Sequence, residues 1–219
     1  MKIYVDGCSD EALLFAEEIG IGVTTNPSII ARECTSKTLS EVIDRLSGLN
    51  VPSIFFQLEH FDEQLLRRLD PNKFVIKVAW IAEKYNLFTC LRKKGFRVCA
   101  TAVYEISQLV FALNYDVDYV AFYYDRAMRR GIDSQRRIRQ FKEIIANCKQ
   151  DTKLIVASLK TASQANEAVI AGADEIALPF SVLREFVEVP EYVRKDVEKF
   201  SEDYKKLFSW EEDDGRISR

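Results

Sequence analysis

The sequence has a single histidine, His60, among its 219 residues. A histidine-rich metal site is therefore excluded, and a Ser-His-Asp triad would depend on this residue alone. We interpret His60 as an ordinary loop or strand-end residue. Acid–base chemistry must then come mostly from Asp, Glu, Tyr, Lys or water.

Other absences exclude further classes of protein. The five cysteines are odd in number and lack CxxC spacing, which predicts neither a disulfide framework nor a zinc site. We interpret Cys8 and Cys99, near two strand ends, as small buried residues rather than reactive thiols. No run approaches the roughly 20 apolar residues of a membrane helix, and no secretory signal is visible. We therefore expect a cytoplasmic protein without a membrane partner.

Basic residues are not in excess. The chain has 31 basic and 34 acidic residues, a formal charge of −3, which argues against a nucleic-acid partner. One segment, 125–140, is nevertheless rich in arginine. It could be read as a nucleic-acid contact, but a solvated helix face is the interpretation that the overall charge favours.

Short apolar runs alternate with helix-like patterns along the whole chain. We expect strands at 2–6, 22–25, 52–58, 73–78, 96–101, 118–123, 153–158 and 174–179. Helices are expected at about 10–19, 37–48, 62–69, 82–94, 104–114, 131–148, 161–171 and 180–187, with a final one at 191–210. Eight strand–helix repeats predict an α/β protein, a (β/α)8 TIM barrel with an additional C-terminal helix.

No stretch rich in Pro, Ser or Gly interrupts this pattern, so residues 1–219 are expected to form one domain. A doubly wound open sheet is the alternative, but neither GxGxxG nor GxxxxGK[ST] is present. Ser9 or Asp10 is expected to cap the first helix and Asp62 the third. Gly20 and Gly172 are expected at helix C-termini.

In such barrels the functional groups lie at the carboxyl ends of the strands. Seven of the eight expected strand ends are polar, and the eighth is apolar. This pattern predicts a site at that face of the barrel. The polar residues at these ends are Asp6, Thr24, Thr25, Asn26, Gln57, Glu59, Lys77, Thr101, Tyr123, Arg126, Ser158 and Lys160.

Lys77 is the unusual member, because it lies within the apolar stretch FVIKVAW at 74–80. A lysine there could pack its stem on apolar walls and extend its amine to water. In the centre of a barrel, burial instead favours the neutral amine. A neutral amine attacks carbonyl carbon and forms a Schiff base. With so few histidines, this is the most economical chemistry.

Schiff-base chemistry on a ketose needs further groups. Asp6 is suited to take a hydroxyl proton during carbon–carbon cleavage, and Tyr123 or Glu59 to move a proton at the enamine carbon. Amide and hydroxyl groups must hold the sugar, and a phosphate needs cationic or hydroxyl donors. The candidates for the sugar are Asn26, Gln57 and Thr101, and those for the phosphate are Arg126, Ser158 and Lys160.

The segment GVTTNPSII at 22–30 resembles the second-strand signature of the small transaldolases and fructose-6-phosphate aldolases. The order and spacing of further segments hold over essentially the entire chain. These segments are VDGCSD (5–10), VIKV (75–78), ATAVY (100–104), YVAFYYDR (119–126), ASLKTASQA (157–165) and AGADEIALP (171–179). The resemblance implies a (β/α)8 barrel, in agreement with the strand pattern.

The resemblance also implies roles for the matched residues. Lys77 matches the Schiff-base lysine, Asp6 the acid that handles the C4 hydroxyl proton, and Asn26 the asparagine beside the Schiff base. Thr101 and Ser158 line the same pocket, and Thr25 is expected to contact the substrate there. Arg126, Ser158 and Lys160 match the phosphate clamp.

Three residues favour the aldolase branch of the family. Gln57 stands where transaldolases carry Glu, Tyr123 where they carry Phe, and Ala121 precedes that Tyr by two positions. The resemblance then implies a metal-independent class I aldolase that needs no cofactor. It would cleave a phosphorylated ketose, with fructose 6-phosphate giving dihydroxyacetone and glyceraldehyde 3-phosphate. A transaldolase of the pentose phosphate pathway is the alternative.

Some residues depart from the family pattern. Ala79, Trp80 and Ile81 follow the lysine where the family has Pro and Thr, and Phe122 replaces a proline before Tyr123. We expect these changes to surround the substrate and Trp80 to alter the mouth above the lysine. A non-catalytic sugar-phosphate-binding paralogue is therefore a second alternative. The helix over 191–210 is expected to pack on a neighbouring subunit of a pentamer or decamer.

Overall fold

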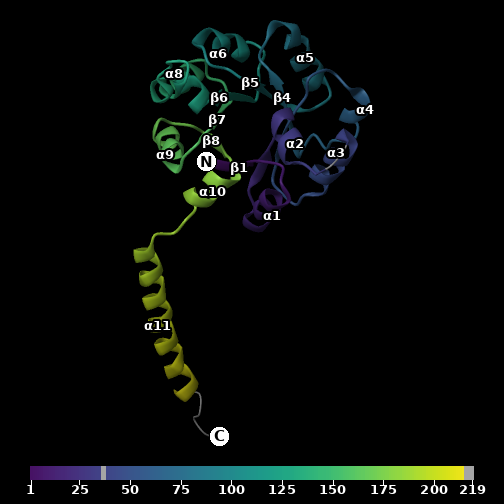
Figure 1. Cartoon of the computed structure of the whole chain (residues 1–219). Coiled ribbons are helices and arrows are strands. Elements are labelled where there is room, and N and C mark those ends of the chain that lie inside the picture. The colour runs from purple at the N-terminus through teal and green to yellow at the C-terminus, as the bar shows by residue number, and fades with distance from the viewer. Residues whose placement is uncertain (36–37, 215–219) are drawn as a thin grey trace. The chain divides into compact units, whose positions relative to one another are not determined.

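The computed structural model describes residues 1–35 and 38–214, with side chains described as far as Leu207. In this part of the chain, eight parallel strands close into a barrel in chain order, and helices follow the strands (Figure 1). The predicted TIM barrel and the additional C-terminal helix are confirmed. The strands are β1 (Lys2–Asp6), β2 (Gly22–Thr24), β3 (Ile54–Gln57), β4 (Phe74–Ala79), β5 (Arg97–Thr101), β6 (Tyr119–Tyr123), β7 (Lys153–Ala157) and β8 (Glu175–Leu178).

The helices of the barrel surround these strands, and their bounds follow the predicted segments closely. They are α1 (Asp10–Ile19), α2 (Pro27–Glu33), α3 (Leu39–Gly48), α4 (Glu63–Leu66), the 3-10 turn η1 (Ala82–Lys84), α5 (Tyr85–Lys93), α6 (Ile106–Leu113), α7 (Tyr124–Met128), α8 (Ser134–Asn147), α9 (Ala162–Ile170) and α10 (Phe180–Phe186). α2 and α7 were not predicted. The predicted start of the second helix, Lys37, lies outside the described residues.

Local signals at the helix ends explain most of these bounds. Ser9 Oγ accepts from the N–H of Ala12 at the start of α1, and Asp62 caps α4 in the same way. Gly20 ends α1 with a φ of 70°, where a side chain would be strained. Thr38 begins α3 with a capping box that includes Glu41. The short α2 begins with Asn26 as its cap and Pro27 at its first position.

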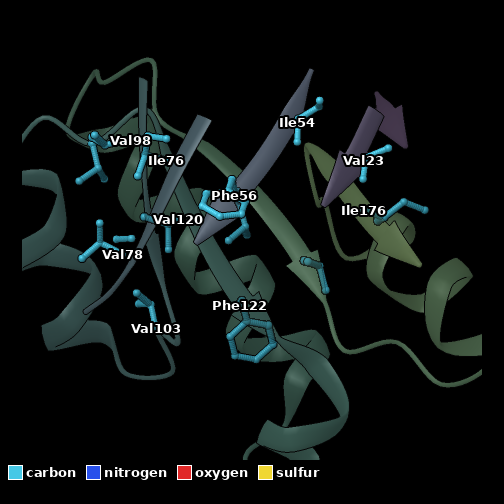
Figure 2. Packing of buried hydrophobic residues seen from close by; sticks show 14 of the residues in the cluster. Val23, Ile54, Phe56, Ile76, Val78, Val98, Val103, Val120, Phe122 and Ile176 are labelled. Carbon is cyan, nitrogen blue, oxygen red and sulfur yellow. The ribbon is translucent and has the colours of Figure 1, made fainter. Parts of the chain in front are cut away.

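Side chains alternate between two buried layers. Those pointing into the barrel form one cluster: Tyr4, Phe55, Val75, Cys99, Tyr119, Ala121, Ile155, Ala157 and Ala177. Those pointing outward pack against the helices, and Figure 2 shows Val23, Ile54, Phe56, Ile76, Val78, Val98, Val120, Phe122 and Ile176 among them. Because both faces of the strands are covered, the strands read as almost continuous apolar runs.

The chain divides into two compact units, Met1–Phe186 and the residues from Val187 onward. The first unit contains the barrel and the second contains α11 (Glu191–Asp214). α11 carries exposed apolar side chains, with Tyr192, Val197, Phe200, Tyr204 and Leu207 each more than half exposed. Within the described residues, no helix is both long and apolar enough to cross a membrane.

A buried carboxyl lies near the amino ends of the strands. Glu175 at the start of β8 is only 5% exposed, and its Oε2 accepts a hydrogen bond of 2.8 Å from Tyr4 Oη. Burial raises the pKa of Glu175 above its ordinary value, against the opposing effect of the Tyr4 hydrogen bond. Since the folded-state pKa is raised, stability falls as the pH rises from the pKa of an unfolded glutamate, about 4.3, toward the raised folded-state pKa.

Replacing Glu175 with Gln is therefore expected to stabilise the protein at neutral pH. The gain should be about 1 kcal/mol, within the usual range for single stabilising substitutions. It should disappear below the pKa of an unfolded glutamate, about 4.3, where both chains are uncharged at this site. Urea unfolding at pH 8 and at pH 4 measures the effect. Glu143→Gln, at an exposed position of α8, is the control and should change neither value. A variant that is less stable at pH 8 would contradict the prediction.

Candidate active site

A small cavity of about 100 Å³ lies at the carboxyl ends of the strands. It brings together residues from β1, α2, β4, β6 and the segment after β7, which are far apart in the sequence. The residues that line it are Asp6, Asn26, Ser28, Ile29, Arg32, Lys77, Tyr123, Arg126, Ala157, Ser158 and Lys160. Seven of these are predicted site residues, so the strand-end pattern led to one place in the structure.

Lys77 lies on the inward side of β4 and is 4% exposed. Its Nζ donates to Thr24 Oγ1 at 3.0 Å and to the carbonyl oxygen of Thr25 at 3.1 Å. Both acceptors are uncharged, and no carboxylate forms an ion pair with this amine in the described part of the chain. The amine is thus held by neutral oxygens in a largely apolar barrel interior. This is the environment that Schiff-base chemistry requires.

Asp6, the last residue of β1, lines the same cavity. Burial raises the pKa of its carboxyl, the nearby Lys77 lowers it, and Glu33 raises it further. Burial dominates, so the net direction is upward. A carboxyl with a raised pKa beside an amine suits proton transfer.

Tyr123 ends β6, and its hydroxyl lies 2.6 Å from Thr101 Oγ1. The guanidinium carbon of Arg126 lies 4.9 Å from the centre of the Tyr123 ring, a cation–π contact. The phenol is therefore oriented from two sides, by Thr101 at its hydroxyl and by Arg126 at its ring. Thr101 itself is 2% exposed and acts on the cavity through Tyr123 rather than by lining it.

Cations and hydroxyls line another part of the cavity. Arg126, Lys160 and Arg32 supply positive charge, and Ser158 and Ser28 supply hydroxyls. Ser158 has a φ of 59°, the left-handed region, although it is not glycine. Backbone strain of this kind is concentrated at functional sites. Its carbonyl oxygen accepts from the Asp125 N–H at 3.1 Å, which ties the strained residue to α7. The cationic side chains and hydroxyls of this part of the cavity together suit the binding of a phosphate.

Several predicted residues do not line the cavity. The Thr25 side chain is buried, and only its carbonyl reaches Lys77. Ala121 is buried in the inner cluster of the barrel. Gln57 pairs in register with Lys77, but its amide donates to Glu59 Oε1 at 2.7 Å. Both Gln57 and Glu59 line a separate, more apolar cavity of about 290 Å³.

Glu59 is therefore a poor candidate for the proton transfer that it could have shared with Tyr123. Its Oε2 forms an ion pair with Lys84. The hydrogen bond from Lys84, helped by that from Gln57, lowers the pKa of Glu59. A carboxylate that stays ionised cannot donate a proton, so Tyr123 is the better candidate.

The expected effect of Trp80 on the mouth above the lysine was wrong. Side chains alternate along β4, so Lys77 points inward and Trp80 points outward. Trp80 is 3% exposed and packs with the rings of Tyr85, Phe88, Phe111 and Tyr115. It fills the space beneath α5 and α6, away from the cavity.

The prediction that Phe122 surrounds the substrate was wrong for the same reason. It is fully buried in the outward layer (Figure 2), where its ring lies 5.7 Å from that of Phe141 on α8. Neither Phe122 nor Trp80 surrounds the substrate position. The departures from the family pattern at these residues concern packing between strands and helices.

Ser28, Ile29 and Arg32 were missed because α2 was not predicted. Asn26 followed by Pro27 is a helix-start signal, since Asn caps and Pro fits the first position. Residues 28, 29 and 32 then share one helical face. That signal would have placed Arg32 at the site. Thr24, the hydroxyl partner of Lys77, was noted at the strand end without a role.

The arginine-rich segment agrees with the interpretation as a helix face. Arg129 pairs with Asp125, Arg137 with Glu105, and Arg130 stacks over the Tyr104 ring at 4.6 Å. These guanidinium groups are engaged within the protein. Among the described side chains, no group of three or more His, Cys, Asp or Glu residues is arranged to hold a metal ion.

Larger hollows occur at the other end of the barrel. One of about 420 Å³ includes Arg97, Tyr119 and Lys153, near the amino ends of β5, β6 and β7. None of the polar strand-end residues lines it. Since the amino face of such barrels serves stability rather than catalysis, the smaller cavity beside Lys77 is the candidate active site.

Comparisons with known proteins agree with this geometry. Residues 62–218 match the family model for transaldolase/fructose-6-phosphate aldolase. A probable fructose-6-phosphate aldolase of Streptococcus pneumoniae is 31% identical over 191 residues, covering 84% of this chain and 86% of its own. A probable transaldolase of Brachyspira hyodysenteriae is 26% identical over 216 residues, covering 95% of this chain and 99% of its own.

Solved structures support the fold alone. A cube-shaped designed protein cage matches with a TM-score of 0.59 and 14% identity, covering 98% of this chain and 80% of that one. A putative lactate oxidase of Pediococcus acidilactici matches with a TM-score of 0.58 and 11% identity, covering 81% and 62%. The sequence matches are the more specific findings, and by them the chain belongs to the transaldolase/fructose-6-phosphate aldolase family.

Proposed function

We propose that the protein is a class I aldolase that cleaves and forms a carbon–carbon bond of a phosphorylated ketose through a Schiff base on Lys77. The observation that carries this proposal is the buried Lys77 amine, bonded to two neutral oxygens in a cavity that also holds Asp6. Fructose 6-phosphate is the proposed substrate, with dihydroxyacetone and glyceraldehyde 3-phosphate as products.

The proposed cleavage uses each group once. Lys77 Nζ adds to the C2 carbonyl of the ketose, water leaves, and an iminium forms. Asp6 takes the proton of the C4 hydroxyl, the C3–C4 bond breaks, and its electron pair moves into the iminium to give an enamine. The aldehyde leaves with its phosphate, which Arg126, Ser158 and Lys160 hold. We assign Asn26, which lines the same cavity, to contact the three-carbon portion.

The enamine must then be protonated at carbon before hydrolysis frees dihydroxyacetone. We assign Tyr123 to orient the water that supplies this proton, because its hydroxyl is fixed 2.6 Å from Thr101 Oγ1. If water cannot reach the enamine, an aldehyde phosphate takes the three-carbon unit instead, and the enzyme is a transaldolase. The likeness to both an aldolase and a transaldolase keeps this second function as the alternative.

Borohydride trapping tests the central step. The protein incubated with fructose 6-phosphate and borohydride should gain the mass of the reduced three-carbon or six-carbon adduct on Lys77. Peptide mapping identifies the modified lysine. Absence of any adduct would favour the non-catalytic, sugar-phosphate-binding alternative. That alternative depended partly on Trp80 altering the mouth above Lys77, and Trp80 does not line the cavity.

Tyr123→Phe separates the aldolase from the transaldolase. Removing the hydroxyl leaves the ring under Arg126 but takes away the group that orients water. We expect release of free dihydroxyacetone to fall about a hundredfold or more, the lower end of the range for a lost proton-transfer group, while transfer to erythrose 4-phosphate persists. Tyr104→Phe, whose ring centre lies 6.0 Å from that of Tyr123, is the matched control. Unchanged dihydroxyacetone release in Tyr123→Phe would contradict this role.

We also propose that the protein assembles into a homo-oligomer and resides in the cytoplasm. The exposed apolar side chains of α11 support packing on a neighbouring subunit in a homo-oligomer, a pentamer or decamer. Light scattering measures the number of subunits. The cytoplasm is the proposed compartment, in keeping with a family of sugar-metabolising enzymes.

A further inference from the structure

Two cysteines lie where two active-site segments meet. Cys8 follows β1 two residues after Asp6, and Cys34 follows α2 two residues after Arg32. The Cys8 N–H donates to Glu33 Oε2 at 2.9 Å, so the two segments are already joined next to Cys34. A change at this junction reaches residues on both sides of the cavity.

The two thiols lie close together and differ in their surroundings. Cys8 is fully buried and Cys34 is half-buried, and the Cys34 side chain is near enough to raise the pKa of the Cys8 thiol. Arg45 Nη1 donates to Cys34 Sγ at 3.7 Å, and Arg45 also pairs with Asp10 at the start of α1. A neighbouring guanidinium favours a thiolate, which is the nucleophile in cysteine oxidation. Cys34 therefore has the access and the charge environment of a first-reacting cysteine.

Cys8 has the opposite character. Burial, with the nearby Cys34 side chain, raises the pKa of the Cys8 thiol to about 12. It stays protonated and out of contact with solvent. Such a thiol does not react first, but it lies beside the sulfur of Cys34 and can react with that sulfur once it is oxidised.

We propose that Cys8 and Cys34 form a redox modification site, in which a hydroperoxide oxidises Cys34 and Cys8 closes a reversible disulfide. The Cys34 thiolate attacks one peroxide oxygen, the O–O bond breaks, and hydroxide leaves as water after taking a proton. The Cys8 sulfur then attacks Cys34, the S–O bond of the sulfenic acid breaks, and a second water leaves. Two thiols and one hydrogen peroxide give one disulfide and two waters, and a dithiol returns the two electrons.

The disulfide would restrain the active site. A covalent S–S bond is shorter than any contact between two separate thiols, so the loop after Asp6 must move toward the end of α2. Displacements near 1 Å reduce catalysis substantially. We expect cleavage of the sugar phosphate to fall roughly tenfold or more and to recover with dithiothreitol. This consequence rests on the proposed function, whereas the disulfide itself does not.

Mass spectrometry of the full chain tests the site directly. After one equivalent of hydrogen peroxide, remaining thiols are alkylated and the protein is digested with trypsin. Cys8 and Cys34 fall in separate tryptic peptides, 3–32 and 33–37. The expected product is these two peptides joined, with two of the five thiols lost. Cys8→Ser should instead leave a sulfenic acid on Cys34 that dimedone traps.

The double variant Cys90→Ser and Cys148→Ser is the matched control, because both cysteines are exposed. It should still form the Cys8–Cys34 disulfide at the same rate. Oxidation at Cys90 or Cys148 before Cys34, or no joined peptide, would overturn the proposal. A joined peptide with unchanged sugar-phosphate cleavage would overturn the coupling to the active site. If Lys77 is never trapped by borohydride while the disulfide forms, only the proposed aldolase function fails.

Discussion

Replacing Lys77 with Met is expected to abolish both ketose cleavage and borohydride trapping. Met keeps most of the length of the side chain without an amine, so no iminium can form. The rate should fall by at least about 10³-fold, the scale seen when a covalent nucleophile is removed. The fold should persist, because an apolar side chain suits the surroundings of this position, next to Val75 and Cys99 in the barrel.

Two measurements keep the result unambiguous. Circular dichroism and thermal unfolding should show a folded variant with a midpoint within a few degrees of the parent, the shift that about 1 kcal/mol produces in a domain of this size. Lys153→Met removes an exposed lysine at the start of β7 and should leave trapping and cleavage unchanged. An adduct that remains in Lys77→Met would place the chemistry on another lysine.

Replacing Asp6 with Asn is expected to separate cleavage from Schiff-base formation. Asn cannot take the proton of the C4 hydroxyl, so cleavage should fall by about 10²–10⁴-fold, the usual contribution of a positioned base. The Lys77 amine remains, and trapping with dihydroxyacetone should persist. Steady-state cleavage and borohydride trapping of the same variant together measure the two effects.

The pH profile of the parent enzyme carries the same information. Burial raises the pKa of Asp6, and the base form is lost as the pH falls through that raised value. The acid limb should therefore lie above the ordinary aspartate range near 3.9. Glu33→Gln removes a charge that raises the Asp6 pKa and should move the limb to lower pH. Asp44→Asn, at an exposed ion pair with Arg68, should leave it unchanged. Cleavage by Asp6→Asn at near the parent rate would contradict the assignment.

Much of the fold could be predicted because the local patterns, such as apolar strands and helix caps, agree with the architecture of the barrel. Each strand is covered on both faces, so it reads as an apolar run, and the barrel helices α1, α3, α8 and α9 each have buried residues and a side-chain cap at the N-terminus. The short helices α2 and α7 follow directly on strand ends, where few residues are available to show a period. They were missed for that reason, and Arg32 was missed with α2.

The site was predictable in outline because strand ends of a parallel barrel converge on one face. Asp6, Asn26, Lys77, Tyr123 and Ser158 could be brought together on that principle alone. Side-chain direction was harder to predict near the strand ends. A shift of one position turns a residue to the opposite face, and this is why Trp80 was predicted at the mouth and Phe122 around the substrate although both pack outward.

The sequence by itself indicated the barrel through its apolar periodicity, the family through its matched segments, and Lys77 as a candidate through strand-end chemistry. All three are local properties of the chain. Only the tertiary structure decided which neighbours each group has. It put Thr24 and Thr25 on the Lys77 amine, tied Gln57 to Glu59, and brought Cys8 against Cys34 across 25 intervening residues. These contacts depend on how separate segments pack against one another, and no pattern within a single segment records that.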